Sequence, residues 1–395
     1  MASDGKILIL KLHDRRLSLL LRGNQILSAS VWHDAAIAVG NIYIGKVQNI
    51  SRNINAAFID LGSKNLTFLP MNDAVSAFVL NRKPDGSLKV GDDVLVQVDR
   101  APMKTKLAGV TTKLSLPGQY TVVGIWPKGQ KGGVQVSAKL DAKRQAHFRE
   151  SEALLRISER FRLIVRTNAG TLEREETLLE EARTLSDTLA HILEIASSRT
   201  CYSCLYRHKG DCVSFVENAY RSEYDEVITD LPEVYDNLLE TCRRADIPLR
   251  LYKDSLLPLY KLYSVEQRLQ ELTDKKVWLK SGGYLVIEPT EALISIDVNT
   301  GKYEAGKDQE ETFYRINREA AEMIAVHLRA RNLSGMILID FINLKSRERK
   351  TELLEYMRTL LKRDPIPARA LDMTALGLME LTRKKVSPSL AEQLR

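Results

Sequence analysis

Two short apolar segments near the end of the chain each deliver an aspartate, and this pair constrains the fold more than any other feature. Residues 293–299 read Leu-Ile-Ser-Ile-Asp-Val-Asn, and residues 336–341 read Met-Ile-Leu-Ile-Asp-Phe. Both runs are typical of buried strands, and residues 311–331 between them carry apolar side chains at helical spacing. A helical crossover between two strands predicts neighbouring strands in one α/β sheet. Asp297 and Asp340 should then face the binding crevice at the strand ends.

The two carboxylates predict a site for a hard cation. A carboxylate in a buried strand costs several kcal/mol unless it is paired or bound to metal. Mg²⁺ prefers oxygen ligands and keeps several waters, so two carboxylates suffice. The pattern alone leaves another reading open, in which each aspartate caps a helix or pairs with an arginine. His327 falls inside the predicted helix and is expected to be structural rather than a general base.

The length and the charge of the chain limit its number of domains and the kind of partner it can bind. A chain of 395 residues predicts about two to four domains. Lys and Arg outnumber Asp and Glu by 58 to 51, and the pI near 9.0 favours a polyanionic partner. Basic residues gather at 329–331, 345–350 and 383–385. A single run is usually a solvated helix face, but three runs beside an acidic site favour a binding surface.

No segment approaches the roughly 18 consecutive apolar residues that cross a bilayer. The first residues lack the basic and apolar regions of a signal peptide, so a soluble cytoplasmic protein is expected. Four cysteines do not make a disulfide framework in so long a chain. Cys201, Cys204 and Cys212, with His208 between them, could hold zinc, although the spacing of the second ligand pair is irregular. Reduced buried thiols are the alternative.

The first hundred residues read as short strands. Residues 6–31 predict a small antiparallel meander, and residues 41–98 predict a compact five-stranded barrel from strands at roughly ten-residue spacing. Further β structure is expected at residues 120–123 and again near residues 163–167. A helix is expected over 174–198 and another, near the end of the chain, over 347–362.

Four stretches then resemble one known family: residues 291–301, 317–321, 335–341 and 377–383. Together they strongly resemble the signature of the RNase E/G family, in order and in spacing. The resemblance extends back to the N-terminus and covers nearly the whole chain.

The resemblance implies an α+β multidomain fold with five segments, in which an RNase H-like portion is split in two. The first RNase H-like segment covers 1–38, an OB-fold RNA-binding β-barrel covers 39–112, and a 5′-end sensor covers 113–208. The second RNase H-like segment covers 209–272, and a DNase I-like α/β catalytic domain covers 273–395.

The resemblance also implies an activity: Mg²⁺-dependent, single-strand-specific endoribonuclease cleavage in RNA processing and decay, leaving 5′-phosphate and 3′-hydroxyl ends. By that similarity Asp297 and Asp340 hold Mg²⁺, and Asn299 supports the site by hydrogen bonding. A non-catalytic RNA-binding scaffold with the same fold is the alternative. Loss of either aspartate would favour it, and both are present.

Three residues of the barrel carry RNA-binding expectations. Phe58 and Phe68 resemble aromatic platforms for base stacking, and Lys106 falls where the family's lysine completes a base pocket. The alternative is that both phenylalanines belong to the core.

The segment around Arg166 resembles the pocket that senses a 5′-monophosphate. Arg166 can grip phosphate through two hydrogen bonds and Thr167 adds a hydroxyl, while backbone amides near Gly118 and Val122 would complete the cradle. Ala138 stands where relatives carry an arginine, so sensing is expected to be weaker unless Lys139 substitutes.

The sequence also departs from the family pattern in a motif that serves assembly. Relatives usually carry a Cys-Pro-x-Cys zinc link shortly after the Ser-Pro-Ser-Leu found here at 387–390. The sequence stops at Arg395 before any such motif. We expect a homodimer or higher homo-oligomer, formed without that zinc unless the chain is cut.

Overall fold

The computed structural model describes residues 4–32, 37–63, 65–74, 78–83, 85–102, 106–127, 129–130, 132–301 and 309–395. They form two compact units. The first joins Met1–Trp32 to Glu223–Arg395, and the second is His33–Ser222. No described helix is both long enough and apolar enough to cross a membrane.

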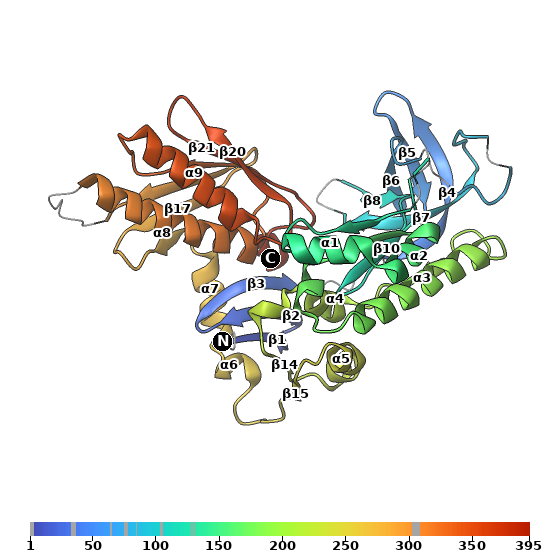
Figure 1. Cartoon of the computed structure of the whole chain (residues 1–395), viewed down its shortest axis with the longest axis horizontal. Helices are drawn as coiled ribbons and strands as arrows, with labels where there is room; N and C mark the ends of the chain where they lie inside the picture. Colours follow the sequence, from blue (N-terminus) through green and yellow to red (C-terminus); the bar gives the residue numbers. More distant parts are fainter. Residues whose placement is uncertain are drawn as a thin grey trace. The chain divides into compact units, whose positions relative to one another are not determined.

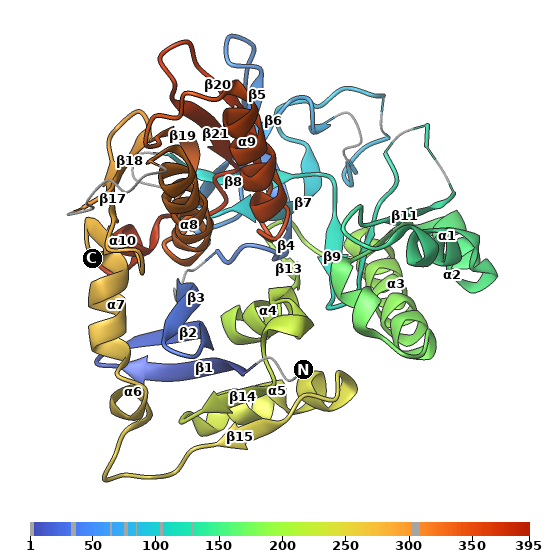
Figure 2. The ribbon, with the colours of Figure 1, turned by 60° about the vertical axis from the view of Figure 1, so that its left-hand side comes forward.

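A sheet built from two distant segments begins the first unit. Its order is β15-β14-β1-β2-β3, formed by β1 (Gly5–Leu12), β2 (Arg15–Arg22), β3 (Gln25–Val31), β14 (Glu226–Thr229) and β15 (Leu249–Leu251). The predicted meander of β1 to β3 is confirmed, and β1 also pairs in parallel with β14. Figure 2 shows β1 between these partners. Ile7 to Leu10 are fully buried, which fits a central strand covered on both faces.

Short helices accompany this sheet. They are α5 (Pro232–Arg244), α6 (Leu259–Leu262), α7 (Val265–Thr273) and α10 (Leu390–Gln393). Leu259, Leu269 and Leu390 pack into the same core as β1 and β2, so the last residues of the chain also help to bury the sheet.

A six-stranded sheet follows in the first unit, in the order β16-β17-β18-β19-β21-β20. Its strands are β16 (Lys276–Trp278), β17 (Tyr284–Pro289), β18 (Ile294–Asn299), β19 (Gly335–Asp340), β20 (Ala368–Met373) and β21 (Met379–Arg383). Helices α8 (Gln309–Ala330) and α9 (Arg347–Leu361) lie side by side along it (Figure 1). Both helices lie within two residues of their predicted bounds.

Helix α8 covers one face of this sheet. Ile316, Ala320, Ile324 and Leu328 are buried at helical spacing against the apolar face of the strands, as predicted. Because side chains alternate along a strand, the polar positions point to the opposite face. The catalytic candidates lie on that face.

A closed five-stranded barrel begins the second unit and confirms the predicted OB-like barrel. It consists of β4 (Ile42–Ser51), β5 (Ala56–Asp60), β6 (Leu66–Pro70), β7 (Asp93–Arg100) and β8 (Ala108–Thr111). The order is β4-β5-β6-β8-β7, and β4 pairs with β7 to close it. β13 (Cys204–Tyr206) adds to β4 from outside the barrel.

A four-stranded sheet with helices completes the second unit. Its order is β11-β12-β10-β9, from β9 (Ser115–Pro117), β10 (Thr121–Gly124), β11 (Val134–Val136) and β12 (Arg162–Val165). The helices are α1 (Ala142–Glu150), α2 (Glu152–Arg160), α3 (Glu176–Ala196) and α4 (Asp211–Asn218), with 3₁₀ turns at Thr167–Thr171 and Arg221–Glu223.

Helix α3 confirms the helix expected over 174–198, whereas α1 and α2 were not predicted. Helix α1 buries only Phe148. It therefore lacks the apolar stripe by which a sequence signals a helix.

Candidate active site

Strands β18 and β19 bring Asp297 and Asp340 side by side. The two strands are parallel, and the two aspartates are direct partners in their register. Neighbouring strands lie about 4.8 Å apart, and laterally paired residues point to the same face. Both aspartates are exposed, while Ile296 and Ile339 before them are buried on the opposite face. The sequence-based expectation that the carboxylates come from neighbouring strands is confirmed.

Asn299 holds one of these carboxylates. Its Nδ2 donates to Oδ2 of Asp297 at 2.7 Å. Asn299 is two residues further along β18 and therefore on the same face. The hydrogen bond orients Asp297 and leaves its second oxygen for another partner.

Helix α8 fixes the loops beside the aspartates. The fully buried Asn317 donates from Nδ2 to the Ile342 carbonyl at 2.7 Å and accepts the Ile342 N–H at 3.0 Å. Glu319 accepts the backbone N–H groups of Lys280 and Ser281 between β16 and β17. Asn317 and Glu319 thus act as positioning residues. The sequence shows them only as part of a family-like motif.

The donor set suits a hard divalent cation. Within the described residues neither Asp297 nor Asp340 pairs with a lysine or arginine, so the ion-pair alternative finds no support there. The described chain also contains no group of three or more His, Cys, Asp or Glu side chains able to hold a metal. Two carboxylates on an open face leave room for several waters, which is the coordination that Mg²⁺ prefers.

The aromatic pair of the barrel lies outside the barrel core. Phe58 and Phe68 are cross-strand partners, and their ring centroids lie 6.2 Å apart at 79°. Both are half-buried, whereas their neighbours Ile59 and Leu69 are fully buried inside. The alternative that both phenylalanines are core residues is therefore wrong.

Two basic residues flank β8, the strand that pairs with β6 at Phe68. Lys106 is exposed just before β8. Gly109 of β8 pairs with Phe68 on one side and Arg100 on the other, and a Cβ at Gly109 would lie 2.8 Å from Arg100 Nε. Gly109, which has no side chain, is therefore the residue between Arg100 and Phe68 across the sheet. It was not predicted, because only the strand register reveals it.

Arg166 directly follows β12 and is half-buried among polar groups. Its guanidinium donates to the Gly118 carbonyl and, at 2.7 Å, to Oδ1 of Asn218. Burial lowers the pKa of Arg166, while Glu181, Glu217 and Tyr220 oppose that shift. The Thr167 and Ser137 hydroxyls are 2.9 Å apart.

The backbone amides of the loop before β10 already bind a carboxylate of the protein itself, that of Glu181. The backbone N–H groups of Gln119, Tyr120 and Thr121 donate to the buried Glu181 carboxylate. The Gly118 N–H donates to the Thr121 carbonyl at 2.8 Å.

Val122 and Lys139 are the remaining expected members of the sensor. Val122 lies within β10, where it pairs with Ile164 of β12. Lys139 Nζ donates to the Tyr220 hydroxyl at 2.8 Å, and the backbone N–H of Lys139 donates to Ser137, the partner of Thr167. Lys139 thus lies close to the residues expected to sense the 5′ end, whereas the exposed Ala138 carries no charge there.

Comparison with known proteins identifies the family. The model of the family described as "Ribonuclease E/G family" matches residues 115–386, more than half of the chain. The chain belongs to this family.

Its relatives include ribonuclease E of Escherichia coli (strain K12), which is 32% identical over 89% of this chain and 34% of its own length. Ribonuclease G of Haemophilus influenzae is 31% identical over 90% of this chain and 74% of its own length. The chain therefore spans about a third of that ribonuclease E and about three quarters of that ribonuclease G.

Three arginines in the basic runs of this ribonuclease E/G family member have structural roles. Arg329 forms two hydrogen bonds of 2.7 Å with Glu223. Arg383 is buried and pairs with Asp364 at 2.7 Å. Arg331 is also buried, and its Nε donates to Nδ1 of His327. These side chains are already committed within the fold.

The cysteines do not assemble into the possible zinc site. Cys201, Cys204 and Cys212 are all free thiols, and the described residues form no metal-binding group with them. Burial and the neighbouring Asp93 raise the pKa of Cys201 to about 11, so it stays protonated.

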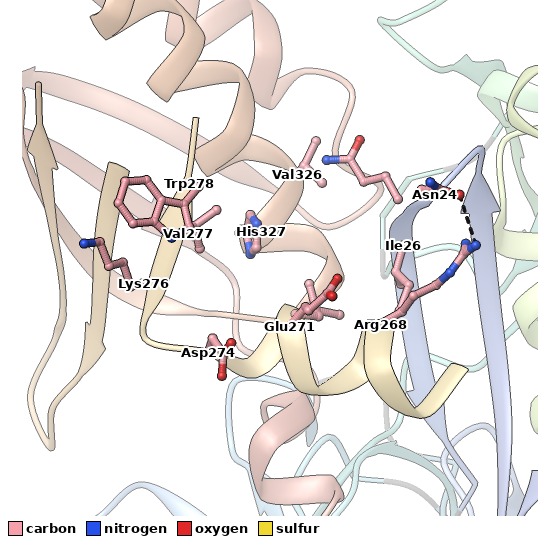
Figure 3. A pocket seen from close by; sticks show the side chains of 12 residues that line it. Asn24, Ile26, Arg268, Glu271, Asp274, Lys276, Val277, Trp278, Val326 and His327 are labelled. Carbon is pink, nitrogen blue, oxygen red and sulfur yellow. Dashed lines mark hydrogen bonds between the residues drawn. The ribbon is translucent and has the colours of Figure 1, made fainter. Parts of the chain in front are cut away.

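A cavity of about 290 Å³ lies at the β16 edge of the six-stranded sheet. Figure 3 shows Trp278 and Lys276 on one side of it and His327 near its middle. Other lining residues come from the turn before β3, the start of β3, helix α7 with the residue after it, and helix α8. None of these residues was predicted to be functional.

Proposed function

We propose that this chain is a Mg²⁺-dependent endoribonuclease that cuts single-stranded RNA. The observation that carries the proposal is the pairing of Asp297 with Asp340 on one open sheet face. Membership of a family whose relatives are named ribonuclease E and ribonuclease G supports the substrate.

The residues around the aspartates serve this reaction in distinct ways. Asp297 and Asp340 hold the cation, and Asn299 keeps Asp297 in the binding orientation. When bound, Mg²⁺ supplies polarisation of the scissile phosphate and a reactive water, which accounts for 5′-phosphate and 3′-hydroxyl products. Asn317 and Glu319 keep the flanking loops in place. The open face admits a flexible strand more easily than a deep pocket would.

The barrel supplies RNA binding in this proposal. The half-buried rings of Phe58 and Phe68 offer faces on which splayed bases stack, and the exposed Lys106, just before β8, contributes positive charge. Stacking needs unpaired bases, which favours single strands over duplexes.

The segment around Arg166 senses the 5′ end. A terminal phosphate would replace the Gly118 carbonyl and Asn218 as the partner of the guanidinium, and Thr167 would add a hydroxyl. The loop amides donate to Glu181 in this structure, so the side chains of Arg166 and Thr167 carry most of the recognition.

The cellular role follows from the family. We propose RNA processing and decay in the cytoplasm, including ribosomal RNA maturation and messenger RNA turnover, by a homodimer or higher homo-oligomer.

One experiment tests the activity. Matched RNA and DNA oligonucleotides are incubated with the protein in Mg²⁺ and then in EDTA. We expect cleavage of RNA with Mg²⁺ and of neither substrate with EDTA. Cleavage of DNA at a similar rate, or of RNA in EDTA, would contradict the proposal.

The aspartate variants test the site. Asp297→Asn or Asp340→Asn should lower cleavage by more than about a hundredfold, because even the loss of a residue that only supports a metal ligand costs about 10- to 100-fold. RNA affinity measured by fluorescence anisotropy should change little, since most phosphate and base contacts are made by other, basic and aromatic residues. If the wild-type protein binds RNA without cutting it, the chain is a scaffold.

A further inference from the structure

An exposed aromatic cluster lies at the edge of the six-stranded sheet. Trp278 of β16 is 62% exposed, which is unusual for so large an apolar ring. Its ring centroid lies 5.4 Å from that of Tyr284 at an angle of 61°. Lys276 Nζ lies 4.0 Å from the Trp278 centroid and 3.7 Å from the Tyr284 centroid. Figure 3 shows Lys276 beside the Trp278 ring.

The strand register places this cluster on the same face as the aspartates. Trp278 pairs with Tyr284, and Tyr284 pairs with Asn299. In the adjacent row Lys276 pairs with Val286, Val286 with Asp297, and Asp297 with Asp340. Directly paired residues point to one face of a sheet.

The distance between cluster and aspartates suits one bound strand. Trp278 lies two strands from Asn299, which is about 10 Å at a strand spacing of about 4.8 Å. Val277, between Lys276 and Trp278, is buried toward the opposite face.

Packing alone does not account for the cluster. Trp278 belongs to no buried core in the described chain. A lysine on an edge strand discourages pairing with other chains, but that protection needs no exposed indole. Within the described residues Lys276 pairs with no carboxylate, so its charge remains available to a phosphate.

We propose that Trp278, Tyr284 and Lys276 form a nucleobase-stacking subsite beside the cleavage site. One base of the RNA strand stacks on the open face of Trp278, and Tyr284 holds that ring from its edge. Lys276 faces the phosphate next to this base. The inference rests on the proposed function, because it names how the same sheet face holds the strand.

Fluorescence tests the stacking directly. The chain has three tryptophans, so Trp32→Phe with Trp126→Phe leaves Trp278 as the sole indole. Single-stranded RNA added in EDTA should quench its emission, with the same midpoint that anisotropy gives for binding. Unchanged emission while anisotropy rises would overturn the subsite. Because cleavage is not needed, the result is independent of the activity.

Kinetics on otherwise wild-type protein provide a second test that does not depend on replacing the other tryptophans. Trp278→Ala should raise KM about five- to a hundredfold, the range that one base–aromatic stack provides. Trp278→Phe should recover most of the loss, and kcat should change little. Leu256→Ala is the control, because Leu256 is an apolar side chain of the same unit that is 95% exposed, in the loop after β15.

Substrates with one abasic nucleotide locate the base. At one position near the cut, the abasic substitution should weaken wild type and leave Trp278→Ala without a further effect. If, at every position tested, the abasic substitution weakened Trp278→Ala by the same factor as it weakens wild type, the proposal would be contradicted. Lys276→Gln should reduce the log–log salt slope of binding by about 0.7, whereas Trp278→Ala should not alter it.

The outcomes separate this inference from the proposed function. If wild type does not cut RNA, the proposed activity fails, and the quenching result still decides whether Trp278 meets a base. If wild type cuts RNA while Trp278→Ala leaves KM and quenching unchanged, only the subsite fails. A change in oligomeric state with unchanged KM would assign the cluster to a protein contact and overturn the proposal.

Discussion

His327, in the last turn of α8, accepts a hydrogen bond from Nε of Arg331 just after the helix, at 2.8 Å. Burial and the adjacent guanidinium lower the pKa of His327 to about 3. The imidazole therefore stays neutral at physiological pH and acts as a structural acceptor, as the sequence predicts. Arg383 also has a structural role, because its guanidinium forms a buried ion pair with Asp364.

His327 should make stability depend on pH. The unfolded chain binds a proton at His327 near pH 6.5, while the folded chain does not until about pH 3. The stabilisation is thus complete above pH 6.5 and is lost as the pH falls toward 3. For this one group the free energy of unfolding should drop by about 2 kcal/mol between pH 7.5 and pH 5. Urea unfolding at several pH values measures it.

His327→Gln is the matched variant, because its amide oxygen can still accept from Arg331. Its free energy of unfolding should vary less over the same pH range. Equal pH dependence in both proteins would show that another group is responsible.

At the scale of elements, α8 links packing to the reactive face. One side of the helix buries Ile316, Ala320 and Ile324 against the strands. The same helix presents Asn317 to the backbone just after Asp340. In the proposed function, the position of this strand end therefore depends on a helix residue that touches no substrate.

Replacing Asn317 should therefore affect both stability and turnover. Asn317→Ala leaves the Ile342 N–H and carbonyl without their partner, at about 1–3 kcal/mol for each buried group. We expect unfolding at lower denaturant and a reduced kcat with little change in KM, because RNA binding rests on other residues. Arg315→Ala, at an exposed position of α8, should change stability by less than about 0.5 kcal/mol. A normal kcat in Asn317→Ala would contradict the positioning role of Asn317.

The sequence predicts what periodicity encodes. Helices α3, α8 and α9 and the strand before Asp340 follow from apolar spacing, and the pairing of Asp297 with Asp340 follows from the crossover between their strands. Trp278 escapes prediction because β16 has only three residues, and its nearness to Asn299 depends on the register of two antiparallel pairs. Likewise, the ion pair that buries Arg383 joins side chains that no local pattern relates.

At the scale of the whole molecule, the two compact units separate the proposed tasks. Asp297 and Asp340 belong to the unit that combines Met1–Trp32 with Glu223–Arg395. The barrel and Arg166 belong to His33–Ser222. Each unit has its own buried core, so a change in one need not disturb the other.

This separation predicts how Arg166→Ala behaves. Wild type should cut RNA with a 5′-monophosphate about tenfold faster than the same RNA with a 5′-hydroxyl. That value is the low end for a charge-assisted contact, because Ala138 removes one expected cation. Arg166→Ala should erase the preference and spare the 5′-hydroxyl substrate. Initial rates on the four combinations measure it, and an equal loss on both ends would make Arg166 structural.

The sheet shared by the two ends of the first unit has a consequence during synthesis. Strand β1 pairs with β14, so Lys6 meets Glu226 only after roughly 220 further residues have left the ribosome. At a synthesis rate of about 5–20 residues per second, the apolar edge of β1 stays unpaired for about 10 to 45 seconds before β14 is made. An unpaired apolar strand edge recruits other chains. Nascent chains of this protein should therefore depend on chaperones most strongly before residue 229 emerges, and the hairpin of β1 and β2 is where we expect them to bind.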